Sequence, residues 1–218
     1  PMFDVPIAVN ISGAHLMRGD LVGDLLATIR EIGIEAHWLT LEVTETWLLD
    51  EADHTLETLR RLTEMGVGLS IDDFGTGYSS LSYLRNFPVA SIKIDRSFIN
   101  ELDRSPTAPA LIKAIVNLAQ ALGARTVAEG IELADQASAL RKLGCDRGQG
   151  YYYCRPLPAS SLGALLREHA DDEVEPLESW RRSSERAQQK VFEVELRHGL
   201  GEITAVASEI EQLNRDLH

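Results

Sequence analysis

The sequence predicts an α/β fold in which parallel strands alternate with helices and close into a β/α barrel. Four helical patterns end at an apolar residue followed by glycine, and a strand-like segment begins within a few residues of each. In addition, the polar residues of six strands fall at the carboxyl ends of those strands. An open, doubly wound sheet would gather such residues mainly at its switch point, so six contributing strands favour a closed barrel.

The strands are expected in six segments that run through most of the chain. In order they are residues 6–12, 37–43, 67–71, 90–98, 124–130 and 145–153. Most of them are short apolar runs bounded by glycine or polar residues, which is typical of a buried strand. Strands that alternate with helices in this way predict parallel pairing and right-handed crossovers.

The helices between these strands are marked by apolar residues at steps of three and four. Two clear examples are Leu21, Leu25, Ile29 and Ile32, and then Leu111, Ile115, Leu118 and Leu122. Glycine just past a helix supplies its left-handed C-cap. The glycines expected to do so are Gly33, Gly66, Gly123 and Gly144.

Each predicted strand turns polar where it ends. The residues concerned are Asn10, Glu42, Asp72, Asp73, Lys93, Glu129 and Gln149. Because the carboxyl ends of barrel strands meet at one face, we expect these side chains to converge there. Alternation along residues 90–98 places Lys93 and Asp95 on the face toward the barrel axis, opposite Ile92 and Ile94.

Several carboxylates gathered around one lysine repel one another unless a cation lies among them. Carboxylate and amide oxygens, without histidine or cysteine, suit Mg²⁺, Mn²⁺ or Ca²⁺ rather than zinc. The adjacent Asp72 and Asp73 can bridge or serve two such ions, an arrangement used in phosphodiester hydrolysis. The sequence therefore predicts a two-metal site that offers positive charge to a phosphate.

Each of these residues also has an ordinary explanation when it is taken alone. Asn10, Glu129 and Gln149 can be turn residues, and Glu42 can be a solvated strand residue. Asp72 and Asp73 can cap a helix, and Lys93 can be a surface lysine with a buried stem. The same position on six strands would require six separate coincidences, so the metal-site interpretation is preferred.

Six segments of the chain together resemble one family. They are AVNIS (8–12), LEVTET (41–46), IDDFGTGYSSLSYL (71–84), IKIDRSFI (92–99), VAEGIE (127–132) and GCDRGQGYYYCRPLP (144–158). In this order and spacing they resemble the EAL domain, the bacterial phosphodiesterase that hydrolyses cyclic di-GMP to linear pGpG. The resemblance covers about residues 7–165.

The resemblance implies a TIM-like (β/α) barrel of EAL type with a Mg²⁺ or Mn²⁺ two-metal site. The implied metal ligands are Asn10, Glu42, Asp72, Asp73 and Glu129. The implied catalytic residues are Lys93, which would hold the attacking water, Glu129 and Asp73. The positions implied to bind substrate or to anchor the loop after Asp73 are Gln149, Glu45, Asp95 and Glu132.

The chain departs from the family pattern because the Glu-Ala-Leu tripeptide and the segment around it are absent. We therefore expect residues 1–166 to form an EAL domain that is incomplete at its N-terminus, with impaired hydrolysis. The alternative is a catalytically silent EAL-like module that binds cyclic di-GMP or a protein partner. A purely structural dimerisation unit is a third possibility.

Composition narrows the expected partners and the compartment. A net charge of −13 argues against binding to duplex nucleic acid, and the sequence has no apolar run long enough to span a membrane. Cys145 and Cys154 are expected to be reduced, as in a cytoplasmic protein. The family resemblance also implies a homodimer that is fused to further signalling domains.

Residues 167–218 are expected to form a charged linker and a helical extension. Apolar residues near its end alternate steps of three and four, which is typical of a short coiled coil. They are Ile203, Val206, Ile210, Leu213 and Leu217. The likeness to the family ends before this segment.

Overall fold

A computed structural model of the chain describes residues 7–12, 20–45, 52–77, 84–153, 155–156, 161 and 195–196. Its parallel strands form one sheet: β1 (Ile7–Asn10), β2 (Leu39–Thr44), β3 (Gly68–Phe74), β4 (Ser91–Ile94), β5 (Arg125–Ala128), β6 (Arg147–Gly148) and β7 (Glu195–Leu196). Its helices are α2 (Leu21–Ile32), the short 3₁₀ helix η1 (Ala36–Trp38), α4 (Ala52–Glu64), α6 (Arg96–Asn100), α7 (Ala108–Leu122) and α8 (Ala134–Leu143).

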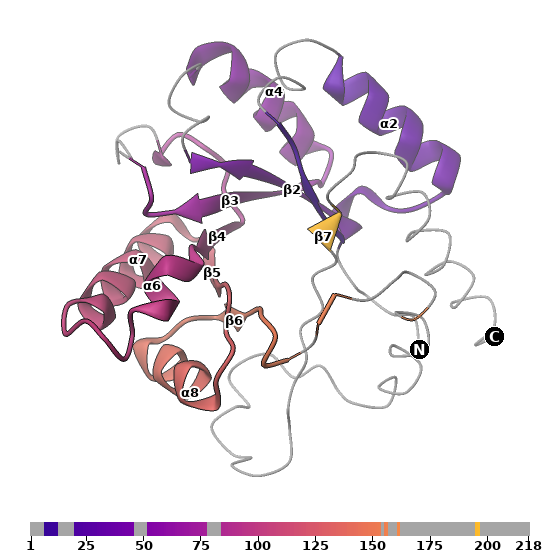
Figure 1. The fold of residues 1–218 in the computed structure, drawn as a ribbon. Coiled ribbons are helices and arrows are strands. Elements are labelled where there is room, and N and C mark those ends of the chain that lie inside the picture. The colour runs from indigo at the N-terminus through magenta and orange to yellow at the C-terminus, as the bar shows by residue number, and fades with distance from the viewer. Residues whose placement is uncertain are drawn as a thin grey trace.

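The order of the strands identifies the type of sheet. Across the sheet the strands run β6-β5-β4-β3-β2-β1-β7, so the first six are neighbours in chain order without any reversal. A doubly wound sheet reverses its order at a switch point, whereas a barrel does not. The helices lie around the outside of the curved sheet (Figure 1). The predicted TIM-like fold is thereby confirmed, and within the described residues the barrel is incomplete, with β6 and β7 at opposite ends of the sheet.

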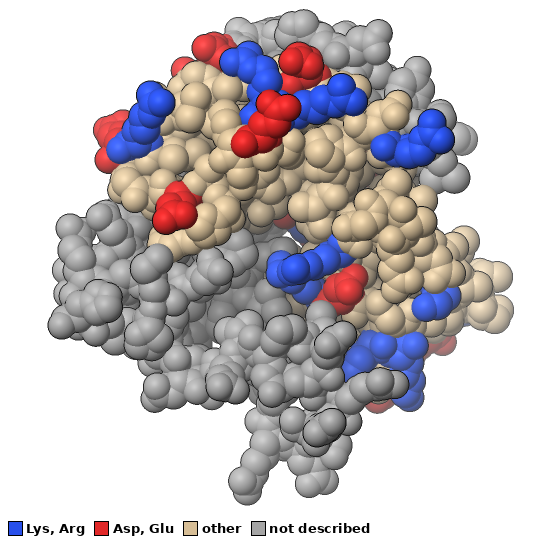
Figure 2. All heavy atoms as spheres, turned by 180° about the vertical axis from the view of Figure 1, so that it is seen from behind, with Lys and Arg blue, Asp and Glu red and all other residues tan. Residues whose placement is uncertain are grey.

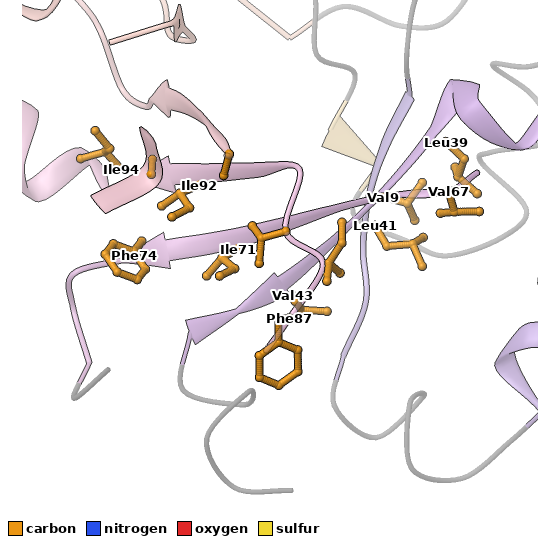
Figure 3. Close-up of a cluster of buried hydrophobic side chains, with 14 of the residues drawn as sticks. Val9, Leu39, Leu41, Val43, Val67, Ile71, Phe74, Phe87, Ile92 and Ile94 are labelled. Atoms are coloured by element: carbon orange, nitrogen blue, oxygen red, sulfur yellow. The ribbon is translucent and has the colours of Figure 1, made fainter. Parts of the chain in front are cut away.

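The core lies between the sheet and the surrounding helices. Strand residues such as Val9, Leu41, Ile71 and Ile92 are at most 3% exposed and belong to one apolar cluster (Figure 3). Fully burying one such side chain contributes about 1.5–3 kcal/mol to stability. The alternate residues of the same strands therefore face the opposite side, which is the interior of the barrel.

The helix stops occur where the sequence predicts them. Gly33 ends α2 with φ 79°, and its N–H donates to Ile29 O. Gly123 ends α7 with φ 72°, and its N–H donates to Ala119 and Gln120. Both glycines adopt the left-handed conformation that residues with a Cβ rarely take. Each returns the chain to the sheet within a few residues.

Three strand predictions extend too far. Of the segment 145–153, only Arg147–Gly148 form a strand, β6, and residues 151–153 form a turn. His37 and Trp38 belong to η1 rather than to a strand, so β2 begins at Leu39. Likewise, Arg96–Phe98 lie in α6. The side chain of Asp95 accepts a hydrogen bond from the Ser97 N–H at 2.9 Å, which caps that helix and ends the extended segment.

The C-terminal part of the chain contributes a strand to the sheet. Glu195–Leu196, which fall in the range expected to be linker and helix, form β7 and pair in parallel with Ala8 and Val9 of β1. The coiled coil expected at residues 203–217 lies outside the described residues.

The described residues include one of the two cysteines. Cys145 is a free, buried thiol, and Cys154 lies outside the described residues. Among the helices that the structure describes, none has the length and apolar character needed to cross a membrane.

Candidate active site

A buried lysine surrounded by three carboxylates stands at the centre of the barrel mouth. Lys93 Nζ lies 2.7 Å from Glu42 Oε2, 2.7 Å from Glu129 Oε1 and 3.2 Å from Asp72 Oδ1. The side chains of Lys93 and Glu42 are each 2% exposed, those of Asp72 and Glu129 13% and 18%. The structure thus brings together four residues that the sequence singled out.

Adjacent strands of the sheet supply these four side chains. Glu42 comes from β2, Asp72 from β3 and Lys93 from β4, and Glu129 directly follows β5. The Glu129 N–H donates to Ile94 O at 3.1 Å, which extends the β4–β5 pairing up to the site. Parallel strands bring their carboxyl ends to one edge, so residues distant in sequence meet there.

An irregularity in β3 explains how two consecutive aspartates reach one site. Between Ile71 and Phe74 the register with β4 shifts by one residue, because Ile71 pairs with Ile92 while Phe74 pairs with Ile94. Asp73 has φ 52°, and its N–H donates to Asp72 Oδ1 at 3.1 Å. This is a β-bulge, which re-aims a side chain that regular alternation would turn away.

The bulge was not predicted, although the sequence contains a signal for it. Leu69 and Ile71 are two residues apart, as alternation requires, but the next core residue is Phe74, three residues further on. That extra step shows that one residue is inserted between the two core positions. Aspartate tolerates the left-handed conformation of Asp73 better than most residues.

The site around Lys93 carries more negative than positive charge, and the pKa values of its groups are shifted accordingly. Burial alone would lower the pKa of Lys93, but the carboxylates of Glu42, Glu129 and Asp72 outweigh it and raise the pKa. Burial, helped by the charges of Asp72 and Asp73, raises the pKa of Glu129 to about 7 despite the opposing Lys93. Burial and the charges of Asp72 and Asp95 also raise the pKa of Asp73. One lysine therefore does not neutralise this cluster.

The arrangement of oxygens fits a divalent cation. Asp72, Asp73 and Glu129 each offer a carboxylate oxygen, and these atoms lie within 4.8 Å of one another. Hard oxygen donors of this kind suit Mg²⁺ and Mn²⁺. A cation bound beside Glu129 would favour its ionised form and would oppose the rise in its pKa that burial causes.

The two residues at the flanks of the site are placed by their strands. Asn10 pairs with Glu42 across the β1–β2 ladder and is partly buried. Gln149 follows β6, and its N–H donates to Ala128 O at 2.8 Å. Within the described residues, Gln149 Oε1 is buried without a hydrogen-bond partner. A buried acceptor of this kind is costly unless another group completes it.

Glu45 lies just beyond β2 and holds the loop that follows β3. Its carboxylate accepts a hydrogen bond from the Gly75 N–H at 2.7 Å, and the side chain is buried. A Cβ added at Gly77 would lie only 3.2 Å from Glu45 Oε1, so the loop passes close to this carboxylate. Residues 78–83 of the same loop lie outside the described residues.

The remaining two acids differ in their position. The charge of Asp95 helps to raise the pKa of Asp73, and the Asp95 side chain also caps α6. Glu132 is exposed, and its backbone N–H donates to Gln136 Oε1 at 2.9 Å. Asp95 thus borders the carboxylate cluster, whereas the described contact of Glu132 belongs to the start of α8.

Comparisons with known proteins agree with this geometry. The family model described as EAL domain matches residues 2–156. The cyclic di-GMP phosphodiesterase NbdA of Pseudomonas aeruginosa is 44% identical over 173 residues, which are 79% of this chain and 22% of that protein. The bifunctional diguanylate cyclase/cyclic di-GMP phosphodiesterase MucR of the same organism is 45% identical over 163 residues, 75% of this chain and 24% of that protein. The chain therefore spans less than a quarter of the length of either relative.

Solved structures show the same fold. A PaMucR phosphodiesterase in complex with c-di-GMP is 44% identical with a TM-score of 0.70, covering 72% of this chain and 64% of that chain. The EAL domain of Mycobacterium smegmatis DcpA is 37% identical with a TM-score of 0.71, covering 75% and 73%. A manganese/cy-diGMP complex of Klebsiella pneumoniae BlrP1 is 32% identical with a TM-score of 0.65, covering 69% and 38%. Strand order, site position and family match agree, and the chain belongs to the EAL domain family.

Proposed function

We propose that this domain hydrolyses cyclic di-GMP to linear pGpG at a site that holds two Mg²⁺ or Mn²⁺ ions. The observation that carries the proposal is the convergence of Glu42, Asp72, Asp73 and Glu129 around the buried Lys93 at the carboxyl ends of the strands. The relatives named as cyclic di-GMP phosphodiesterases support the choice of substrate.

The metal ligands in this proposal are the oxygen-bearing side chains at the barrel mouth. They are Asn10, Glu42, Asp72, Asp73 and Glu129. When bound, the ions would neutralise charge on the scissile phosphate and lower the pKa of a water molecule. The protein itself is acidic, with a net charge of −13, and basic and acidic side chains are intermingled on the described face in Figure 2. An anionic substrate therefore depends on positive charge inside the site.

Lys93 is assigned the role of holding the attacking water. An ammonium group has three N–H donors, and here Glu42, Glu129 and Asp72 lie around it. The contact with Asp72 is the longest of the three at 3.2 Å. If Asp72 held a cation instead, Lys93 would have one donor free for the water.

The neighbouring residues are assigned supporting roles. Gln149, whose buried Oε1 lacks a partner within the described residues, is proposed to contact the substrate. Glu45 anchors the loop after β3, and Asp95 is retained as a substrate-binding or loop-anchoring candidate beside Asp73. Glu132 is retained as a substrate-binding or loop-anchoring candidate from its place in the VAEGIE segment.

The proposal predicts that metal binding and hydrolysis are lost together. Replacing both Asp72 and Asp73 by alanine removes two of the three oxygens that lie within 4.8 Å of one another. We expect Mn²⁺ affinity in calorimetry to fall, and turnover of cyclic di-GMP to fall by on the order of a hundredfold or more. Asp103→Ala, which removes an exposed carboxylate that does not belong to the cluster, is the matched control. Unchanged Mn²⁺ uptake and turnover in the double variant would refute the proposal.

The impaired hydrolysis expected from the missing Glu-Ala-Leu segment stays a prediction. Calorimetry with cyclic di-GMP beside the turnover assay separates the two functional alternatives. Binding without turnover, with Mn²⁺ present, would select the catalytically silent module. Turnover close to that of an intact EAL domain would show that the expectation of impairment is wrong.

The partners and the compartment are proposed on the same basis. We propose a cytoplasmic, dimeric signalling protein in which further domains adjoin this one, without a role in duplex nucleic acid binding. The support is the family membership and the length of the relatives, of which this chain spans less than a quarter.

A further inference from the structure

The two shortest contacts of Lys93, with Glu42 and Glu129, lie on opposite sides of its strand. The contact with Glu42 reaches across the strand in between. Lys93 lies on β4 and Glu42 lies on β2, with β3 between them in the sheet. Neighbouring strands are about 4.8 Å apart, so the two backbones are roughly 10 Å apart. Lys93 Nζ nevertheless lies 2.7 Å from Glu42 Oε2. The side chains of Lys93 and Glu42 together therefore span the inner face of β3.

A small residue, Ser70, lies on the inner face of β3 between the strands of Lys93 and Glu42. Asp72 and Ser70 are two residues apart on this face, and Ser70 is the ladder partner of Glu42 on one side and of Ser91 on the other. Ser70 is 1% exposed. The strand residue below it, Gly68, has no room for a side chain, since a Cβ there would lie 2.8 Å from Thr40 Oγ1. Bulky branched residues ordinarily fill this level of a β/α barrel.

The hydroxyl of Ser70 is engaged on the side of β4. Ser91 Oγ donates a hydrogen bond to Ser70 Oγ at 2.8 Å. This bond ties the short side chain of Ser70 to the strand from which Lys93 starts. It also satisfies polar atoms in a place where an unpaired hydroxyl would be costly.

We infer that Ser70 is a positioning residue for Lys93. Its small side chain leaves the path across β3 open, so that the ammonium group reaches Glu42, and the bond from Ser91 keeps the hydroxyl out of that path. A larger side chain at position 70 fills the path and moves Lys93 away from Glu42. The consequence for catalysis rests on the proposed function, in which Lys93 holds the attacking water.

The test compares variants that differ in size at position 70, in the full chain. Ser70→Ala removes the hydroxyl without adding volume, whereas Ser70→Val adds volume on the path. The first readout is the NMR signal of the Lys93 ammonium protons, which is visible when these protons are buried and hydrogen-bonded. The signal is assigned by its loss in Lys93→Met. It needs neither metal nor substrate.

We expect Ser70→Ala to keep the ammonium signal and, where turnover is measured, a kcat within about twofold of wild type. Ser70→Val should lose the signal and lower kcat by on the order of a hundredfold, with a much smaller change in KM. Urea denaturation checks that both variants fold. If Ser70→Val does not fold, Ser70→Thr takes its place. Threonine keeps the hydroxyl and is nearly the same size as valine, so it should lose the signal as well.

Two results would overturn the inference. One is a protected ammonium signal in the folded larger variant. The other is an equal loss of the signal in Ser70→Ala, which would make the hydroxyl decisive rather than the space. A wild-type chain that shows the signal but does not hydrolyse cyclic di-GMP would count against the proposed function alone.

Discussion

Glu129 is the residue at which the charge imbalance of the site is most evident. Its pKa is raised to about 7, first by burial and then by the charges of Asp72 and Asp73, while Lys93 opposes the shift. In the unfolded chain the same carboxyl has a pKa near its ordinary value of about 4.3. The folded state therefore binds the proton of Glu129 more tightly than the unfolded state does.

This difference predicts a loss of stability with rising pH in the metal-free protein. The contribution of Glu129 to the free energy of unfolding is fully present below about pH 4.5 and is lost as the pH rises through about 7. The shift corresponds to an upper limit of roughly 3 kcal/mol. The free energy of unfolding, measured in urea between pH 5 and pH 8 with chelator present, should show the decline.

Glu129→Gln is the control for this pH dependence because it removes the titrating group and keeps the shape. We expect the variant to show a flatter pH profile than the wild type, and saturating Mn²⁺ to flatten the wild-type profile as well. An equally steep profile in Glu129→Gln would place the dependence on another group.

At the residue scale, the sequence was sufficient to predict that polar side chains meet at the strand ends. The reason is that residue type and strand position are both visible in the sequence for Glu42, Asp72, Lys93 and Glu129. The ion pairs themselves were not predicted. Which oxygen contacts Lys93 depends on the separation of strands and on side-chain conformations, and neither has a local sequence signal.

At the element scale, the bulge in β3 makes a prediction about the backbone. Asp73 has φ 52°, a conformation that asparagine tolerates and β-branched residues do not. Asp73→Asn and Asp73→Val both remove the charge, so their comparison isolates the backbone. We expect Asp73→Val to be less stable than Asp73→Asn by about 1–2 kcal/mol in urea denaturation.

The matched control for this comparison lies on the neighbouring strand. Thr44 is an exposed residue of β2 with regular ladder pairing to Asp72. There valine should be the more stable of the two replacements, because β-branched residues favour an extended backbone. The same order of stability at both positions would contradict a left-handed Asp73 in solution.

Element boundaries were harder to predict than element types. The apolar periodicity of residues 111–122 and the glycine after it were enough to predict α7 and its stop. Residues 96–98 belong to a segment predicted as a strand, but Asp95 caps a helix there. The Ser97 N–H and the Ser97 hydroxyl both donate to Asp95 Oδ1, and these contacts favour the helix.

At the scale of the whole molecule, β7 from the C-terminal part of the chain pairs with β1 near the N-terminus. Glu195 and Leu196 pair with Ala8 and Val9, so β1 has a partner strand on each side. The periodicity of residues 167–218 did not predict this strand, because a two-residue pairing has no pattern of its own. An otherwise open strand edge is a liability for aggregation, and a partner on β1 reduces it.

The pairing predicts slow hydrogen exchange in β1 that depends on the C-terminal segment. Leu196→Pro removes a backbone donor and disfavours the strand. We expect at least one amide of β1 to exchange on the order of tenfold faster in this variant, with the amides of β3 and β4 unchanged. Identical exchange in both proteins would show that β7 does not persist in solution.

The bulge also limits how this sheet can be altered. An engineer who deleted the one surplus residue of β3 would obtain an unbroken ladder with β4, and Phe74 would stay in the apolar layer. The same deletion would leave one carboxylate where the strand now presents two to the barrel mouth. In β3, a regular ladder with β4 is therefore incompatible with two adjacent aspartates that both face the site.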